Sequence, residues 1–168
     1  NNSNSGIVTT TSGGKVKKVV VTWHSNTVAG RTLNIYGMNS AYSAATDLYD
    51  KSTRGDLLGT IVSGTSTELV IEGDYEYIGM RSAAGAMYIK EIKITWDSLD
   101  EEETVGDGTE VIEEATMKSF GWSNAYGIDA PFNLGDNVTI TVSQGGASTA
   151  PTYYSDVEAL CLYQNGAT

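Results

Sequence analysis

The sequence has very few of the residues that build covalent cross-links or histidine chemistry. Its 168 residues include one cysteine, Cys161, and one histidine, His24. A lone cysteine cannot form an internal disulfide, and a lone histidine provides neither a histidine-based metal site nor the pattern of a Ser-His-Asp triad. We expect Cys161 to be an inert thiol buried in a strand, and His24 to be an ordinary residue at a strand end.

Positive charge and long apolar segments are also scarce. Ten lysines and arginines stand against 21 aspartates and glutamates, and the formal net charge is −11. Such a charge repels phosphate backbones and anionic membranes over any extended contact, so we expect neither nucleic acid nor a membrane as a partner. No apolar run approaches the roughly 20 residues that cross a bilayer.

The residues that are abundant are typical of β-structure. Hydrophobic residues make up 40% and charged residues only 18%, and windows rich in helix-forming residues are rare. A chain of 168 residues is long enough to bury one real core. About ten short alternating segments, separated by turn signals, predict an all-β fold, a two-sheet β-sandwich of the jelly-roll type with little helix.

Residues 75–96 carry the clearest alternation. Ile78 and Met80 alternate with polar or small residues, and the pattern resumes after a turn at residues 82–85 and continues to Trp96. A period of two is typical of a strand with one face in a core, so the stretch predicts a β-hairpin. Its other face would be available for function.

Two further segments have specific local signals. In residues 15–23, Val16 shares the apolar face that ends at Trp23 only if a β-bulge occurs at residues 17–18. We expect Trp23, like Trp96, to point into the core. Residues 43–50 begin with a serine at a possible N-cap, which predicts one short helix on a loop.

The predicted organisation is a single module, residues 1–168, in two parts. Residues 98–110 are acidic and rich in turn residues, without periodicity, which indicates a linker or a long surface loop. Residues 1–97 form the first part, and residues 111–168 complete the sandwich. The two parts do not repeat each other.

Carboxylates flank this acidic connection. Asp97 ends a predicted strand, Asp107 lies within the connection, and Glu113 and Glu114 lie in the strand that follows it. Calcium takes about six to eight oxygen ligands from carboxylates and loop carbonyls. These residues either hold a calcium ion or solvate a surface loop, and no EF-hand pattern distinguishes the two.

Tyrosine and tryptophan provide the strongest functional signal. Ten tyrosines and three tryptophans stand against two phenylalanines. Their rings combine a flat apolar face with a polar edge, which matches sugars, but such rings also cap sandwich cores, and both roles stay open. The candidate carbohydrate-binding residues are Trp122, Asn124, Tyr126, Tyr153, Tyr154, Asp156, Tyr36 and Arg81. We expect the loops that carry the first six to lie near one another, with the last two extending the same surface.

Five segments combine alternation with aromatic residues: RTLNIYG at 31–37, YIGMRS at 77–82, AMYIKEIKITW at 86–96, APTYY at 150–154 and LCLY at 160–163. Together they resemble β-sandwich carbohydrate-binding modules appended to secreted polysaccharide-degrading enzymes and surface proteins of gut and rumen Bacteroidetes. In such modules the APTYY segment precedes the RTLNIYG segment, whereas here it follows. This order fits a circular permutant or a piece that spans two tandem modules.

The resemblance implies a noncatalytic module that binds a plant cell-wall polysaccharide, such as xylan or a β-glucan. It implies an extracellular or bacterial cell-surface protein, a parent enzyme domain as a neighbour, and no organic cofactor. It also implies one structural calcium ion near Asp97, Glu113 and Glu114. The alternative is a structural spacer or adhesin module, and a third candidate, a small lyase or hydrolase, requires paired carboxylates at reacting distance.

Overall fold

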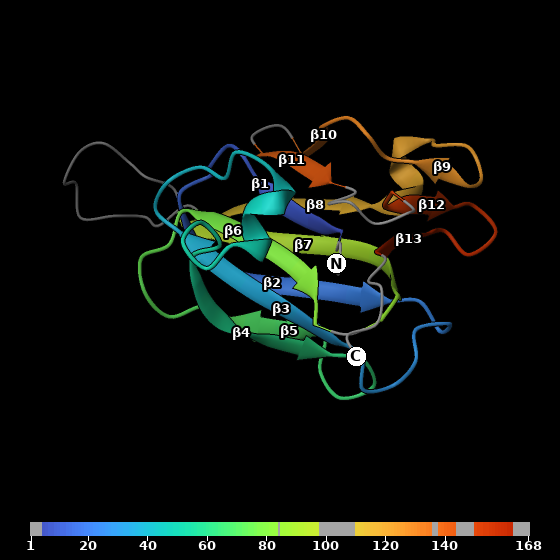
Figure 1. Cartoon of the computed structure of the whole chain (residues 1–168), viewed down its shortest axis with the longest axis horizontal. Coiled ribbons are helices and arrows are strands. Elements are labelled where there is room, and N and C mark those ends of the chain that lie inside the picture. Colours follow the sequence, from blue (N-terminus) through green and yellow to red (C-terminus); the bar gives the residue numbers. More distant parts are fainter. Residues whose placement is uncertain (1–4, 84, 98–109, 136–137, 144–149, 163–168) are drawn as a thin grey trace.

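Two antiparallel β-sheets pack face to face in the computed structural model of this chain (Figure 1). The structure describes residues 5–83, 85–97, 110–135, 138–143 and 150–162, with the side chains of residues 110–113 and 143 excepted. The all-β two-sheet sandwich predicted from the sequence is confirmed. None of the helical segments in these residues is long and apolar enough to cross a membrane.

Each sheet contains strands from distant parts of the chain. The first sheet has the order β10 (Phe132–Leu134), β11 (Val138–Ser143), β1 (Gly6–Thr9), β6 (Tyr77–Ser82), β3 (Thr32–Met38) and β4 (Asp56–Val62). The second has the order β5 (Glu68–Val70), β2 (Lys15–Trp23), β7 (Met87–Asp97), β13 (Ala159–Leu162), β12 (Thr152–Tyr154) and β9 (Tyr126–Gly127), with β8 (Glu110–Thr116) also paired to β7. Two 3-10 turns accompany them, η1 (Ala45–Tyr49) and η2 (Met117–Phe120). The strands outnumber the ten predicted because several edge strands have only two or three residues.

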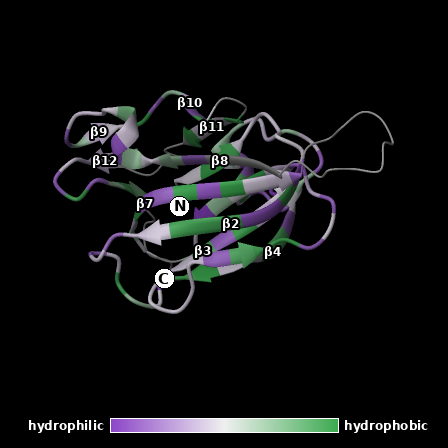
Figure 2. Cartoon of the chain, turned by 180° about the vertical axis from the view of Figure 1, so that it is seen from behind, coloured by the Kyte–Doolittle hydropathy of each residue, from purple (hydrophilic) through white to green (hydrophobic). Residues whose placement is uncertain are grey.

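Alternate residues of both sheets meet in one apolar core. Figure 2 shows apolar and polar residues alternating along β2 and β7. The largest contributors to the core are fully buried: Ile7, Leu33, Ile35, Ile78, Met80, Val19, Ile92, Ile94 and Trp96. Burial of each such side chain contributes roughly 1.5–3 kcal/mol, so this layer accounts for most of the favourable free energy of folding. Trp23 is only half buried, and its indole N–H donates to the Ser66 carbonyl at 3.2 Å.

Strands β6 and β7 do not form the predicted hairpin. Strand β6 pairs with β1 and β3, whereas β7 pairs with β2, β8 and β13, so the chain changes sheets between Ser82 and Met87. Both strands alternate because each lines the core from its own sheet. Alternation cannot distinguish two strands that pair from two that face each other across a core, and the hairpin prediction is wrong for that reason.

Strand β2 is irregular at two places in its pairing with β7. The register shifts between Val16 and Lys18, which confirms the predicted bulge and leaves Val16 fully buried. A second shift places Thr22 opposite Glu91 and Trp23 opposite Ile89, so that Lys90 is an extra residue. A bulge of this kind turns two consecutive side chains to the same face of a sheet.

Residues 43–50 contain the predicted short helical segment, in the form of the 3-10 turn η1. The predicted serine cap is not what begins it. Instead the Asp47 carboxylate accepts the backbone N–H groups of Ser43 and Ala44, at 2.7 and 3.1 Å. The turn packs on the outer side of the first sheet, where Leu48 is fully buried.

Both parts of the chain contribute strands to both sheets. Strand β11 pairs with β1, and β8 and β13 pair with successive segments of the same edge of β7. The predicted acidic connection at residues 98–110 lies outside the described residues, apart from the backbone of Glu110. Strand pairing therefore ties residues 111–162 to the sheets that residues 5–97 begin.

This arrangement predicts one cooperative unfolding transition, because neither part can lose its strands without exposing the common core. Denaturant curves followed by circular dichroism and by tryptophan fluorescence should coincide. Trp96→Ala should lower the free energy of unfolding by about 3–5 kcal/mol, the usual cost of emptying a buried aromatic site. Two separable transitions would contradict the arrangement.

Candidate functional site

Two tyrosine rings line a hollow on the outer face of the second sheet. Tyr88 on β7 and Tyr154 on β12 have ring centroids 6.3 Å apart, with an interplanar angle of 56°. Asn26, Asp156 and Val157 complete the lining of this hollow, whose volume is about 270 Å³. The tyrosine hollow therefore combines two rings with a carboxylate and an amide.

Strand β13 lies between the strands that carry these rings. Its Leu160 and Leu162 point into the core, so Cys161 alternates to the outer side. Cys161 is nevertheless 0% exposed and lies directly opposite Tyr88 in the ladder. The buried position predicted for the thiol is confirmed, although it lies on the outer side of the sheet rather than among the core leucines.

The position and ionisation state of Tyr88 are constrained. Its backbone carbonyl accepts the His24 N–H at 3.0 Å and the Thr27 hydroxyl at 2.9 Å, and its N–H donates to the Thr27 Oγ1 at 3.0 Å. The neighbouring Cys161 sulfur and burial both raise the pKa of Tyr88 above its usual range. His24 follows the last residue of β2, as predicted.

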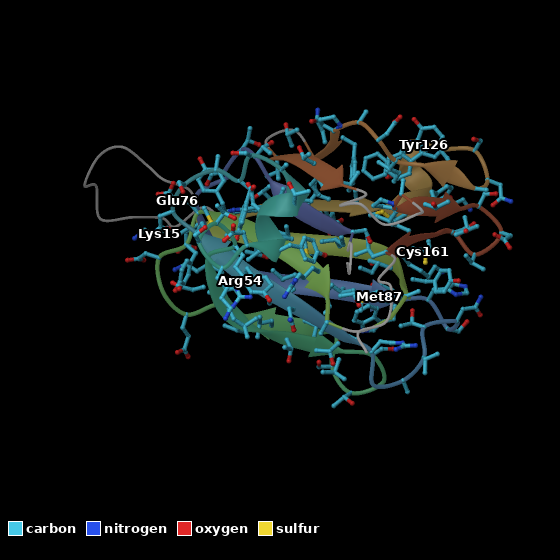
Figure 3. All side chains as sticks on the ribbon, viewed as in Figure 1. Lys15, Arg54, Glu76, Met87, Tyr126 and Cys161 are labelled. Atoms are coloured by element: carbon cyan, nitrogen blue, oxygen red, sulfur yellow. The ribbon has the colours of Figure 1, made fainter. Side chains whose placement is uncertain are left out.

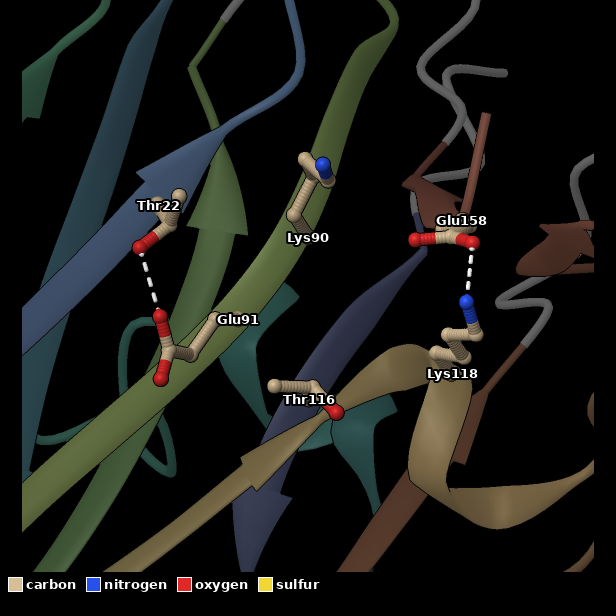
Figure 4. Close-up of a pocket in the computed structure, with 6 residues that line it drawn as sticks. All are labelled: Thr22, Lys90, Glu91, Thr116, Lys118 and Glu158. Carbon is tan, nitrogen blue, oxygen red and sulfur yellow. Dashed lines mark hydrogen bonds and ion pairs between the residues drawn. The ribbon is translucent and has the colours of Figure 1, made fainter. Parts of the chain in front are cut away.

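A polar groove of about 220 Å³ adjoins the tyrosine hollow along β7. The Thr22 hydroxyl donates to the Glu91 Oε2 at 2.8 Å, and the Lys118 Nζ pairs with the Glu158 Oε1 at 2.6 Å (Figure 4). The hydrogen bond to Lys118 holds the pKa of Glu158 below its usual range. In Figure 4, Lys90 lies between these two pairs and is joined to neither.

The polar groove and the tyrosine hollow form one strip because two elements line both. Tyr88 and Lys90 are successive outward residues of β7, and Asp156 and Glu158 belong to the turn between β12 and β13. The bulge at Lys90 adds Glu91 to the same face. The strip thus offers flat rings at one end and both donors and acceptors at the other.

The predicted proximity of the two aromatic loops is confirmed. Tyr126 on β9 lies opposite Tyr153 on β12, and the rings of Trp122 and Tyr153 are 5.7 Å apart, edge to face. The Asn124 Oδ1 accepts the Ser155 N–H at 2.9 Å, which links the loops directly. Six of the eight candidate residues therefore lie close together, on strands β9 and β12 and the loops next to them.

Most rings of this cluster are engaged with the core. The Trp122 ring is nearly parallel to Phe120 at 4.6 Å and to Tyr126 at 6.1 Å, and meets Phe132 edge to face at 5.1 Å. Tyr153 is only 3% exposed. Tyr126, 39% exposed, is the ring that this cluster presents most to solvent.

Tyr36 and Arg81 lie elsewhere, on the first sheet. Tyr36 points away from the core between the sheets, as predicted, but η1 covers it and leaves it 2% exposed. The Arg81 guanidinium lies 5.5 Å from the Tyr36 ring centre and 4.8 Å from that of Tyr49, and its Nε donates to the Tyr36 Oη. These two residues stabilise the packing of η1 and do not line the tyrosine hollow.

The carboxylates predicted to bind calcium are not brought together where the structure describes them. Asp97 pairs with Lys17 at 2.8 Å, and Glu114 pairs with Lys93 at 2.9 Å. Asp97 and Lys93 are four residues apart on β7, roughly 13 Å at about 3.3 Å per residue. Asp107 and the Glu113 side chain lie outside the described residues, within which no three potential ligands cluster. The calcium site stays a prediction.

Several lining residues of the strip were not expected from the sequence, among them Tyr88, Asn26 and Lys90, whereas Glu91 was expected on the outward face of its strand. The sequence could have indicated the position of Tyr88, because Tyr88 alternates with the buried Met87 and Ile89 and so points outward. No sequence pattern indicated that Asn26 lines the hollow, since its position depends on how the loop after β2 folds over the sheet. Lys90 and Glu91 share a face only because of the bulge.

The packing of Trp122 predicts that removal of a core ring costs more stability than removal of a surface ring. Trp122→Ala should lower the free energy of unfolding by about 2–3 kcal/mol, somewhat less than a fully buried aromatic residue. Tyr126→Ala, which removes the exposed neighbour, should cost less than about 1 kcal/mol. Denaturant midpoints measure both, and equal losses would contradict this division.

The strip thus offers two rings, three carboxylates, an amide and two lysines on one sheet face. No protein-family model, curated protein or solved structure matches the chain. The function is accordingly inferred from the geometry and chemistry of the tyrosine hollow and the polar groove.

Proposed function

We propose that the protein is a noncatalytic carbohydrate-binding module and that the tyrosine hollow with the polar groove is its binding site. The observation that carries this proposal is the pairing of Tyr88 and Tyr154 over a hollow that Asp156 and Asn26 also line. Sugar rings present C–H groups on their faces and hydroxyls at their edges. The site offers aromatic faces for the first and polar groups for the second.

The polar groove extends this recognition to a second sugar unit. Lys90 donates hydrogen bonds, and the carboxylates of Glu91 and Glu158 have acceptor oxygens beyond those in their existing contacts. The charges of the groove residues balance, two lysines against two glutamates. A neutral polysaccharide therefore fits better than a polyanion, in accord with the net charge of −11.

Binding without catalysis is supported by the state of these carboxylates. Hydrolysis of a glycosidic bond generally needs one carboxylic acid with a raised pKa beside a second carboxylate. Here the pKa of Glu158 is lowered by Lys118, and Glu91 is held by Thr22. A xylan or a β-glucan of the plant cell wall is the proposed ligand, bound outside the cell next to a parent enzyme domain.

The second candidate function is a structural spacer or adhesin module. The observation that favours it is the engagement of Trp122 and Tyr153 with the core, which gives these rings a role in stability alone. The two functions predict different effects when an outward ring is removed. Loss of the Tyr154 ring leaves the function of a spacer unchanged, whereas it weakens the affinity of a binding module for its sugar.

Tyr154→Ala should weaken binding to soluble xylan or β-glucan by at least tenfold, about 1.4 kcal/mol, while the unfolding midpoint changes little. Affinity electrophoresis and calorimetry measure the binding. Tyr126→Ala is the matched control, because Tyr126 is an exposed ring that lies opposite Tyr153 and hence on the other face of these strands from the half-buried Tyr154.

Undiminished binding by the Tyr154 variant, with loss in the Tyr126 variant, would move the site to the Trp122 cluster. Absence of binding by the wild-type protein to any polysaccharide would favour the spacer.

We also propose the structural calcium ion as a separate, testable feature. An ion that binds only the native state raises the melting temperature by mass action. Excess chelator should then lower the melting temperature, and added calcium should restore it. An unchanged melting curve in chelator would remove the ion from the proposal.

A further inference from the structure

A third hollow, of about 450 Å³, lies at the end of the sandwich away from the tyrosine hollow. Its lining consists of Gly37, Met38, Asn39, Ser40, Gly55, Asp56 and Tyr75. These residues come from the end of β3, the start of β4 and the segment before β6. Three connections therefore converge on one hollow, which we call the loop-end hollow.

Hydrogen bonds to the second sheet place the segment of Tyr75 at the far end of β7. The Tyr75 carbonyl accepts the Val16 N–H at 2.7 Å, and Val16 lies opposite Trp96 in the ladder. Tyr88 is eight residues before Trp96 on the same strand, roughly 26 Å away at about 3.3 Å per residue. In Figure 3, Glu76 and Lys15 lie at one end of the sandwich, and Met87 and Cys161 lie toward the other.

Two glycines, Gly37 and Gly55, allow the close packing beneath this hollow. A Cβ at Gly37 would come within 2.8 Å of the Tyr75 Cγ and 2.7 Å of the Leu58 Cδ1, so the ring packs directly on the Gly37 backbone. Gly55 has φ of +75°, and a Cβ there would collide with the Gly37 carbonyl oxygen. The close backbone approach of residues 37 and 55 thus fixes the floor of the hollow.

The polar groups of the hollow are arranged around this ring. The Tyr75 hydroxyl donates to the Asp56 Oδ2 at 3.0 Å, and this bond to the carboxylate raises the pKa of the phenol. Asp56, Asn39 and Ser40 are all exposed. A ligand in the hollow thus meets a fixed ring edge, the remaining carboxylate oxygen, an amide and a hydroxyl.

We propose that the loop-end hollow is a second binding site for a neutral oligosaccharide. The warrant is the combination of a positioned tyrosine ring with a carboxylate and an amide, the same chemistry as in the tyrosine hollow but supplied by the other sheet. The lining includes an aspartate and no lysine or arginine, so a sugar acid would be repelled there. The inference rests on the proposed function and specifies that the module binds at two separate places.

Two weak sites at opposite ends of the sandwich affect the binding of a polysaccharide differently from the binding of a short oligosaccharide. Once one site holds a long chain, the second binds from a high effective concentration, and the overall affinity exceeds that of either site. A short oligosaccharide cannot occupy both sites at once. Two sites therefore predict two oligosaccharides per protein molecule, and tighter binding of polysaccharide than of its fragments.

Titration of the wild-type protein with xylotriose and with cellotriose, which are too short to reach from one site to the other, tests this by calorimetry and by amide NMR shifts. We expect a stoichiometry of two for the sugar that binds, with shifts around Tyr88 and, separately, around Tyr75. Asp56→Asn and Asn39→Ala should each weaken the second site at least fivefold, and Tyr154→Ala should remove only the first. Asp74→Asn is the matched control, because Asp74 is an exposed aspartate next to Tyr75 that pairs with Lys15 and does not line the hollow.

The outcomes separate this inference from the proposed function. If one oligosaccharide binds per protein molecule, and if Tyr154→Ala abolishes this binding while Asp56→Asn leaves it unchanged, the second site is overturned and the proposed function stands. Binding that Asp56→Asn abolishes and Tyr154→Ala leaves intact supports the loop-end hollow and removes the first site. Absence of binding to either trisaccharide and to the parent polysaccharides overturns both.

Discussion

The rest of the structure depends on the pairing of β7 along both of its edges. This strand, Met87–Asp97, is the longest of those described, and it pairs with β2 on one edge and with β8 and β13 on the other. Because successive side chains point to opposite faces, one strand sends Ile92, Ile94 and Trp96 into the core and presents Tyr88 and Lys90 to solvent. Stability and the candidate site are thus built on the same backbone.

The irregularity opposite Thr22 illustrates how that strand serves both purposes. A regular ladder would alternate strictly, and Lys90 and Glu91 would point to opposite faces. The extra residue keeps both Ile89 and Ile92 fully buried while Lys90 and Glu91 line the polar groove together. This bulge interrupts the pairing at a single residue, so its cost in backbone hydrogen bonds is small relative to the apolar burial that surrounds it.

Tyrosines occupy three different environments in this sandwich. Tyr36 and Tyr42 are covered by η1 and its loop, Tyr153 joins the core between the sheets, and Tyr88 and Tyr154 line an outward hollow. A tyrosine suits all three because its ring gains from burial while its hydroxyl needs a partner or water. Composition therefore indicates that rings are important without separating those that stabilise the fold from those that offer a surface.

The amino-acid sequence by itself determined the fold class, the bulge beside Val16 and the buried positions of Trp96 and Cys161. These follow from local rules, the period of two in side-chain direction and the burial of apolar surface. Tertiary structure alone decided that β6 and β7 belong to different sheets, that η1 covers Tyr36, and that Asn26, Asp156 and Tyr88 line one hollow. Those features depend on contacts between segments far apart in the chain, and alternation within one segment carries no information about which distant segment it meets.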